Sequence, residues 1–143
     1  MQSINYFFED IPEIPNLLNE QVSNWIAGVI QAHNIQIEEI NYIYCSDKYL
    51  LEVNQQYLNH DYYTDIITFD NREQLENPME ADIFISIDRV RENAADMKST
   101  FTDELHRVMI HGVLHLLGQG DKTTSEKAEM RKREEASLSL RKF

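Results

Sequence analysis

Three side chains in the last third of the chain have types and a spacing that suit a metal ion. His111 and His115 lie four residues apart in the segment HGVLHLLGQGDKT, and Asp121 follows six residues later. Residues four apart share one face of a helix, so two imidazoles can reach one ion. A third ligand from the same helix would lie too far along its axis. The chain must therefore turn back before Asp121 can contribute an oxygen ligand.

Two glycines make this return plausible. Gly118 can take the left-handed conformation that ends a helix, and Gly120 keeps the return loop flexible. The pattern His-x3-His-x5-Asp then supplies three convergent ligands and leaves a fourth position for water. This is the arrangement of a catalytic zinc site, whereas a structural site is closed by four protein ligands.

Other interpretations fit the same spacing. Two histidines four apart also occur on solvated surface helices that bind nothing. The metzincin protease pattern HExxHxxGxxH tolerates an acidic last residue, but Gly112 stands where such a protease has its glutamate general base, and the short tail offers no Met-containing turn. Two histidines and a carboxylate can also hold iron for oxygen chemistry, although those ligands seldom come from one helix and its return loop.

The elements that must position these residues follow from hydrophobic periodicity and capping signals. Strands are expected at residues 4–8, 35–44, 64–70 and 81–88, and helices at 15–34, 47–58 and 103–118. One further helix is expected before the helix over 103–118 and another after it. Asp47 and Thr102 are the expected N-caps. The order βαβα, ββ, ααα has no repeat or linker. It predicts one α+β domain over residues 1–143, with a single mixed sheet packed with helices and the metal site on a helix and its return loop.

Composition restricts the class of protein. The 143 residues carry a net charge of −12, which argues against broad phosphate binding and against DNA as a partner. The lone Cys45 is expected to be a buried free thiol in a reducing compartment. The N-terminus has no cationic start, and no run approaches the ~18 apolar residues of a membrane helix, so we expect a cytoplasmic protein that does not contact membranes. The segment EKAEMRKREEASLSLRK is typical of a solvated, salt-bridged helix face.

Three blocks of the sequence together resemble the YbeY family of bacterial metal-dependent endoribonucleases. The first block is similar to the family pattern His-Gly-x-Leu-His-Leu-x-Gly-Tyr-Asp-His, the second to its Asn-x-x-Tyr and Thr-Asp segment, and the third to Gly-Asp-Ile-x-Ile-Ser. The matching residues are His111, Gly112, Leu114, His115, Leu116 and Gly118 in the first block, Asn54, Tyr57, Asp61, Thr64, Asp65, Ile66 and Phe69 in the second, and ADIFIS in the third.

The resemblance implies a zinc-dependent endoribonuclease specific for single strands. It would act in ribosomal RNA maturation, at the 3′ end of the small-subunit RNA, and hence in ribosome biogenesis. Its partners would be the ribosomal RNA precursor and the small subunit or assembly proteins. One Zn²⁺, or another divalent metal, would be held by His111, His115 and Asp121. The alternative within the same resemblance is a metal-bearing ribosome-assembly factor that cuts nothing.

Two departures from the family pattern affect this expectation. Asp121 stands where the family usually has a third histidine, and its carboxylate should make a metal-bound water less acidic than a neutral imidazole would. Leu58 occupies the position of the family's cleft arginine and cannot contact a phosphate. Arg107, on the histidine side of its helix, is one candidate substitute. The general base stays open, with Asp65 and Glu104 as candidates.

Overall fold

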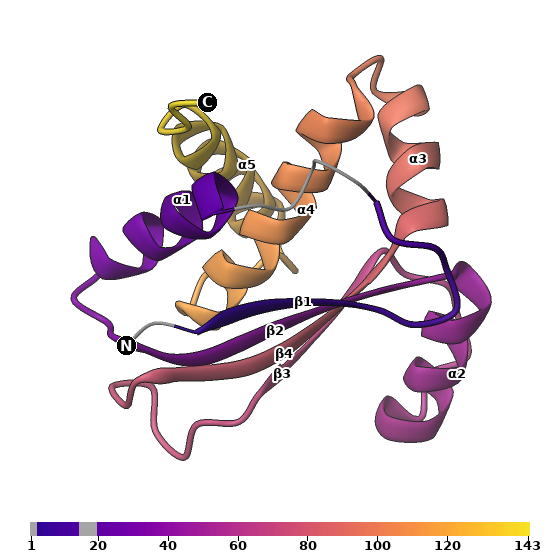
Figure 1. Ribbon diagram of the computed structural model, residues 1–143, viewed down its shortest axis with the longest axis horizontal. Helices are drawn as coiled ribbons and strands as arrows, with labels where there is room; N and C mark the ends of the chain where they lie inside the picture. The colour runs from indigo at the N-terminus through magenta and orange to yellow at the C-terminus, as the bar shows by residue number, and fades with distance from the viewer. Residues whose placement is uncertain (1–2, 15–19) are drawn as a thin grey trace.

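The computed structural model describes residues 3–14 and 20–143. Strands and helices follow one another in the predicted order through this part of the chain (Figure 1). The elements are β1 (Ile4–Phe8), α1 (Glu20–Gln31), β2 (Ile37–Cys45), α2 (Asp47–Leu58), β3 (Ile66–Asp70), β4 (Met79–Ser86), α3 (Ile87–Asp96), α4 (Phe101–Leu116) and α5 (Thr124–Leu138).

The described strands form one mixed sheet in the order β1-β2-β4-β3. β1 pairs in parallel with β2, and β2 in parallel with β4, whereas β3 runs antiparallel to β4. The parallel pairs need crossover connections, and the antiparallel pair is closed by the short loop between residues 70 and 79. The predicted α+β class with a single mixed sheet is confirmed.

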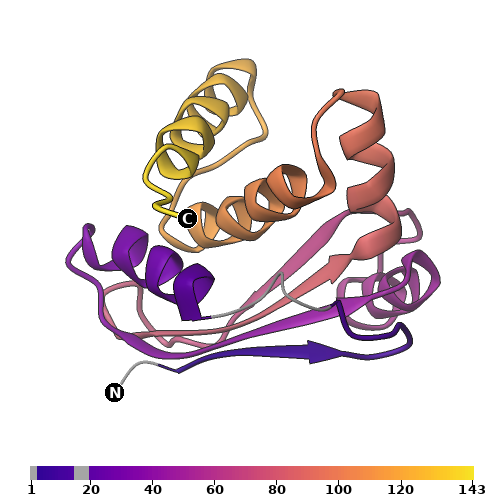
Figure 2. The same ribbon diagram turned by 45° about the horizontal axis from the view of Figure 1, so that its top comes forward.

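Helices cover the two faces of the sheet unequally. α1, α3, α4 and α5 lie on one face and α2 lies against the other (Figures 1 and 2). Side chains alternate between the faces along β4: Ile83 and Ile85 enter the main core, while Phe84 packs on the smaller cluster beneath α2. The strands therefore carry apolar residues on both sides, and α4 lies across the centre of the better-covered face.

Gly112 allows α4 to approach the sheet closely. A Cβ at this position would lie 2.8 Å from Ile66 Cδ1 and 3.3 Å from Ile83 Cγ2, where no such atom fits without movement. The absence of a side chain thus sets the depth at which the helix packs. Because His111 precedes this contact by one residue, the same packing fixes where the His111 ring leaves the helix.

Several helix boundaries in the structure differ from the predicted ones. The N-caps are Ser46 and Thr100, not Asp47 and Thr102, because these two residues have extended backbones and their hydroxyls accept hydrogen bonds from the N–H groups of Tyr49 and Asp103. Asp47 instead binds Arg89, its Oδ2 lying 2.6 Å from Nη2. The predicted helix over 15–34 ends at Gln31, and its first five residues, 15–19, lie outside the described part.

No helix within residues 3–14 and 20–143 is long and apolar enough to cross a membrane. Cys45 is buried, as expected, and burial raises the pKa of its thiol to about 12. The thiol therefore stays protonated at neutral pH and is unsuited to act as a nucleophile.

Candidate active site

The helix that carries the two histidines ends as the sequence predicts. Gly118 has a φ of +104°, in the left-handed region, directly after the cap residue Leu117. The Gln119 N–H donates to the Leu114 carbonyl at 3.0 Å, and the Gly118 N–H to the His115 carbonyl at 3.0 Å. This pair of bonds is a Schellman motif, which satisfies the last carbonyls of the helix and reverses the chain.

The loop after α4 is fixed by the start of α5. Glu126 Oε1 accepts from the N–H groups of Lys122 and Thr123 at 3.2 and 3.0 Å, and Thr123 in turn caps α5 in a capping box. A Cβ at position 120 would collide with the Glu126 carboxylate. Gly120 therefore leaves room for the Glu126 carboxylate, a role other than the flexibility expected from sequence.

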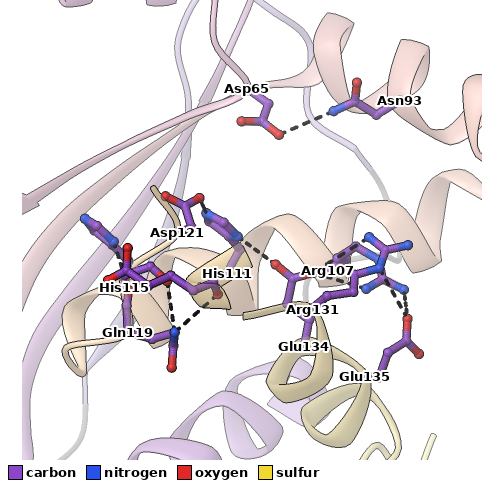
Figure 3. A network of polar contacts seen from close by, with 12 residues as sticks. Asp65, Asn93, Arg107, His111, His115, Gln119, Asp121, Arg131, Glu134 and Glu135 are labelled. Atoms are coloured by element: carbon purple, nitrogen blue, oxygen red, sulfur yellow. Dashed lines mark hydrogen bonds and ion pairs between the residues drawn. The ribbon is translucent and has the colours of Figure 1, made fainter. Parts of the chain in front are cut away.

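The return loop brings Asp121 back to His111, whose ring lies between two carboxylates (Figure 3). The Nε2 atom of His111 is 3.3 Å from Asp121 Oδ2, and its Nδ1 atom is 2.7 Å from Glu134 Oε2 on α5. Burial alone would lower the pKa of His111, but Glu134, Asp65 and Asp121 together raise it above its ordinary value. His111 is thus oriented through one nitrogen and faces Asp121 with the other.

Glu134 is a functional candidate that the sequence analysis missed. Its segment was expected to be a solvated helix face, yet Glu134 is 5% exposed. The buried residues of α5 are Met130, Glu134, Ser137 and Leu138, at helical spacing. This stripe was the available signal, because a charged residue in line with buried apolar positions faces the protein and needs a partner.

A cavity of about 300 Å³ opens beside His111. Its lining includes the three other residues that sequence proposed for catalysis, namely Asp65, Glu104 and Arg107. Asp65 directly precedes β3, and the other two lie on α4. Asn93 of α3 and Arg131 and Glu134 of α5 complete the polar lining. Tertiary packing therefore brings four of the six residues proposed from sequence to a single cavity.

Two carboxylates in this cavity hold a proton more readily than usual. Burial raises the pKa of Asp65, and the nearby His111 only partly offsets this increase. Asn93 donates from Nδ2 to Asp65 Oδ2 at 3.3 Å. Burial also raises the pKa of Glu104, against the opposing effect of Arg107. Glu104 is 4% exposed, and its Oε1 has no hydrogen-bond partner among the described residues.

Three carboxylates already pair with the guanidinium of Arg107. Its guanidinium lies 3.1 Å from Glu134, 2.5 Å from Glu135 and 3.7 Å from Glu104. Its side chain is 16% exposed, whereas that of Arg131, on the same cavity, is 50% exposed and approaches Glu134 only at 3.9 Å. Arg131 is thus the more available cation.

The predicted metal site, which includes His115, is only partly assembled. The exposed His115 ring has Nδ1 3.3 Å from the Gln119 carbonyl. Over residues 3–14 and 20–143 no group of three or more His, Cys, Asp or Glu side chains is placed to hold a metal. The His111–Asp121 separation of 3.3 Å does fit. Two ligands about 2.0–2.1 Å from a tetrahedral ion are roughly 3.3 Å apart. The three-ligand set stays a prediction.

Comparison with known proteins identifies the family. The family model described as Endoribonuclease YbeY matches residues 9–141. The chain belongs to the YbeY family. A relative from Cytophaga hutchinsonii, named Endoribonuclease YbeY, is 52% identical over 138 residues, which cover 96% of this chain and 96% of the relative. Another of the same name, from Flavobacterium psychrophilum, is 50% identical over 142 residues, covering 98% of this chain and 96% of its own length.

A solved structure agrees with this assignment. The solution structure of TM1509 from Thermotoga maritima is similar to this chain with a TM-score of 0.67 and 26% identity, over 95% of this chain and 87% of that one. The two chains therefore share the fold of the mixed sheet and its helices.

Membership of the YbeY family, together with the packing of Gly112, also removes the protease interpretation. Residue 112 faces Ile66 and Ile83 of the sheet, so a glutamate there would point into the core, away from His111. Leu58, which the resemblance predicts to replace the family's cleft arginine, is the last residue of α2 and is 39% exposed.

Proposed function

We propose that this YbeY-family chain is a metal-dependent endoribonuclease that cuts single-stranded segments of ribosomal RNA precursors in the cytoplasm. Its place of action would be the 3′ end of the small-subunit RNA, with the small subunit or its assembly proteins as partners. The relatives' shared name supports the reaction class. The observation that carries the proposal is the His111 ring, held between Glu134 and Asp121 beside a cavity lined with buried carboxylates.

His111, His115 and Asp121 would hold one zinc ion. When bound, zinc would polarise a water molecule or a phosphoryl oxygen of the RNA. Glu134 supports this set because it accepts the Nδ1–H of His111 and leaves Nε2 free to coordinate. The Gln119 carbonyl stands in the same relation to His115, with Nδ1 3.3 Å away. Both rings would then present the same nitrogen to one ion.

The carboxylates of the cavity would move protons during hydrolysis. Asp65 is the better-placed candidate for general base, because its side chain is only half-buried and has Asn93 as its polar contact. Glu104 is almost wholly buried and shares Arg107 with two other glutamates. Arg131, exposed at the rim, would meet a phosphate of the RNA, while Arg107 holds Glu104 and Glu134 in position.

The direct test combines metal content with ribonuclease activity. Purified protein should carry about one zinc ion per chain and cut an unstructured ribosomal RNA fragment, and His115→Ala should lose both the metal and cleavage while staying folded. Removal of zinc from the native protein should stop cleavage, and its return should restore it. Zinc-loaded protein that cuts no RNA would favour the non-catalytic assembly factor, and full metal retention by His115→Ala would refute the ligand set.

Asp121 separates a metal ligand from an ordinary loop residue. Asp121→Ala should weaken zinc binding strongly, Asp121→His should retain it, and Asp121→Asn should be intermediate because one oxygen remains while the charge is lost. Zinc titration of the three variants measures this. If Asp121 were only a solvated residue, each change would cost under about 0.5 kcal/mol of stability and leave zinc affinity unchanged.

A further inference from the structure

The end of α2 and the loop that follows it expose three tyrosine rings. Tyr57 is 64% exposed, Tyr62 56% and Tyr63 54%, and Leu58 lies beside them on the chain. Single exposed apolar side chains are common, but a group of large aromatic ones gathered in a short segment marks a surface that meets a partner.

This loop is held in a defined shape by buried contacts. Asn54, 1% exposed, donates from Nδ2 to the Tyr62 carbonyl at 2.9 Å, and its own carbonyl accepts from the His60 N–H at 3.1 Å. Asn59 caps α2 in the left-handed conformation, with a φ of 58°. The exposed rings therefore sit on a fixed backbone, so little ordering entropy would be lost when a ligand stacks on them.

Each of two tyrosines already has a stacking or cationic neighbour. The rings of His60 and Tyr62 are stacked, with centroids 5.1 Å apart, and the Tyr62 hydroxyl is 3.0 Å from His60 Nδ1. The Arg89 guanidinium lies 5.4 Å from the centroid of the Tyr63 ring. Since more than half of each tyrosine remains exposed, both still offer aromatic surface to a further planar group.

The loop leads along the chain to Asp65, which lines the cavity of the candidate active site. Tyr63 precedes Asp65 by two residues, and its neighbour Arg89 lies one turn before Asn93 on α3. Asn93 contacts Asp65 at 3.3 Å, and both residues line the cavity that holds His111. A strand of RNA whose phosphate occupied the cavity would thus have its next bases beside Tyr63 and Tyr62.

Charge at this surface favours stacking over phosphate contacts. Arg89 is already paired with Asp47 at 2.6 Å and approaches Glu92 at 3.6 Å, so it offers little net positive charge. Base stacking on an aromatic ring needs no net charge and tolerates any base, since each base has a π face.

We propose that Tyr62, with His60 behind it, and Tyr63, with Arg89 behind it, form a base-stacking platform that positions the nucleotides next to the scissile phosphate. The assignment rests on the proposed ribonuclease function. The two tyrosines are positioning residues, which hold the unpaired strand in register while the groups of the cavity act on the phosphate.

Binding of a cleavage-resistant probe tests the platform separately from catalysis. Native protein should bind a fluorescent phosphorothioate oligoadenylate more tightly than the matching oligouridine, because purines stack better. Tyr62→Leu and Tyr63→Leu should each weaken oligoadenylate binding about tenfold and reduce the preference for adenine, whereas Tyr62→Phe and Tyr63→Phe should keep both. Phe7→Leu, which alters an exposed ring on β1, is the matched control and should change neither.

Two further measurements keep the outcomes distinct. An abasic oligomer should bind native protein about tenfold more weakly than oligoadenylate does, a comparison that needs no variant to fold. In RNA cleavage, the leucine variants should raise KM and leave kcat nearly unchanged. Cleavage by the native protein with no effect of the leucine changes or of base removal would overturn the platform and leave the ribonuclease function standing.

The converse result also discriminates. Tyrosine-dependent binding of oligoadenylate by a protein that cuts no RNA would overturn the ribonuclease function, and would leave the tyrosines as a base-stacking site without a role in cleavage. Leucine variants that bind RNA normally but fail to associate with small ribosomal subunits would show that the rings dock a protein, which would overturn the platform as a site for bases.

Discussion

At the residue scale, Glu134 is the side chain on which the orientation of His111 depends. Its Oε2 atom is 2.7 Å from His111 Nδ1, and the carboxylate is 6% exposed. Glu134→Gln keeps the size but removes the charge that favours the Nδ1–H form of the ring, so zinc affinity should fall by roughly 10- to 100-fold. Titration of metal-free protein with zinc against a competing chelator measures the change.

The neighbouring residue supplies the control for that experiment. Glu135 also pairs with Arg107, at 2.5 Å, but its side chain is 58% exposed, and Glu134, not Glu135, is the residue bonded to His111. Glu135→Gln should therefore leave zinc affinity within about twofold of the native value, as expected for a surface ion pair. Equal losses in the two variants would mean that α5 acts through its overall charge and not through the bond to His111.

At the element scale, the packing of α4 on the sheet depends on a missing side chain. Gly112→Ala would place a Cβ 2.8 Å from Ile66 Cδ1, so the helix or the strand must shift, and we expect a loss of about 1–3 kcal/mol in unfolding free energy. Because the shift would also move His111, zinc affinity should fall in the same variant. Denaturant unfolding and zinc titration measure the two effects.

Gly28 is the matched control at this scale. It lies inside α1, is exposed, and has nothing within 4 Å of the position where a Cβ would stand. Gly28→Ala should stabilise the protein by roughly 0.5–1 kcal/mol, because alanine loses less backbone entropy in a helix than glycine does. A destabilised Gly28→Ala, or a Gly112→Ala as stable as the native chain, would contradict this account of α4 packing.

At the scale of the whole molecule, His106 joins α4 to α1 and to the C-terminal residues. It is 3% exposed, its ring lies 5.4 Å from Trp25 and 5.7 Å from Phe143, and its Nδ1 atom accepts from Arg141 at 2.8 Å. Burial, followed by the positive charge of Arg141, lowers the pKa of His106 from 6.5 to about 4. The folded protein therefore holds this ring neutral.

This buried histidine should make stability fall in mild acid. Below its unfolded pKa of 6.5 the unfolded chain binds a proton that the native ring does not accept until about pH 4, so unfolding becomes progressively easier across that interval. The loss should reach roughly 3 kcal/mol. The unfolding free energies of native protein and of His106→Phe should be measured between pH 6.5 and about pH 4. Over this interval the native value should fall by that amount relative to the value of the variant. A constant difference would show that His106 does not titrate as described.

Overall charge sets a second expectation at this scale. With a net charge of −12, the protein should bind RNA through few phosphate contacts, so the logarithm of affinity should fall only shallowly with the logarithm of salt concentration. A salt titration of oligonucleotide binding measures the slope. A steep slope, like that of a protein that neutralises many phosphates, would require a basic surface that the charge balance does not suggest.

The sequence by itself determined the features that depend on near neighbours in the chain. The β-branched run of β4, the helical spacing of α4 and the glycine that ends it were all predicted, and so were the element order and the mixed sheet. Cap residues were misplaced by one or two positions because several polar residues compete for the same turn, and only the backbone angles choose among them.

Tertiary structure decided the contacts between distant segments. His111 and Glu134 are 23 residues apart and meet only because α5 packs beside α4, and Arg107 is occupied by the same helix. Tyr63 and Arg89 likewise meet through the packing of α3 beside the loop after α2. Periodicity reports which face of an element is buried but not which element will cover it. The residues that could act were therefore visible in the sequence, whereas the partners that orient them were determined by the packing of the helices.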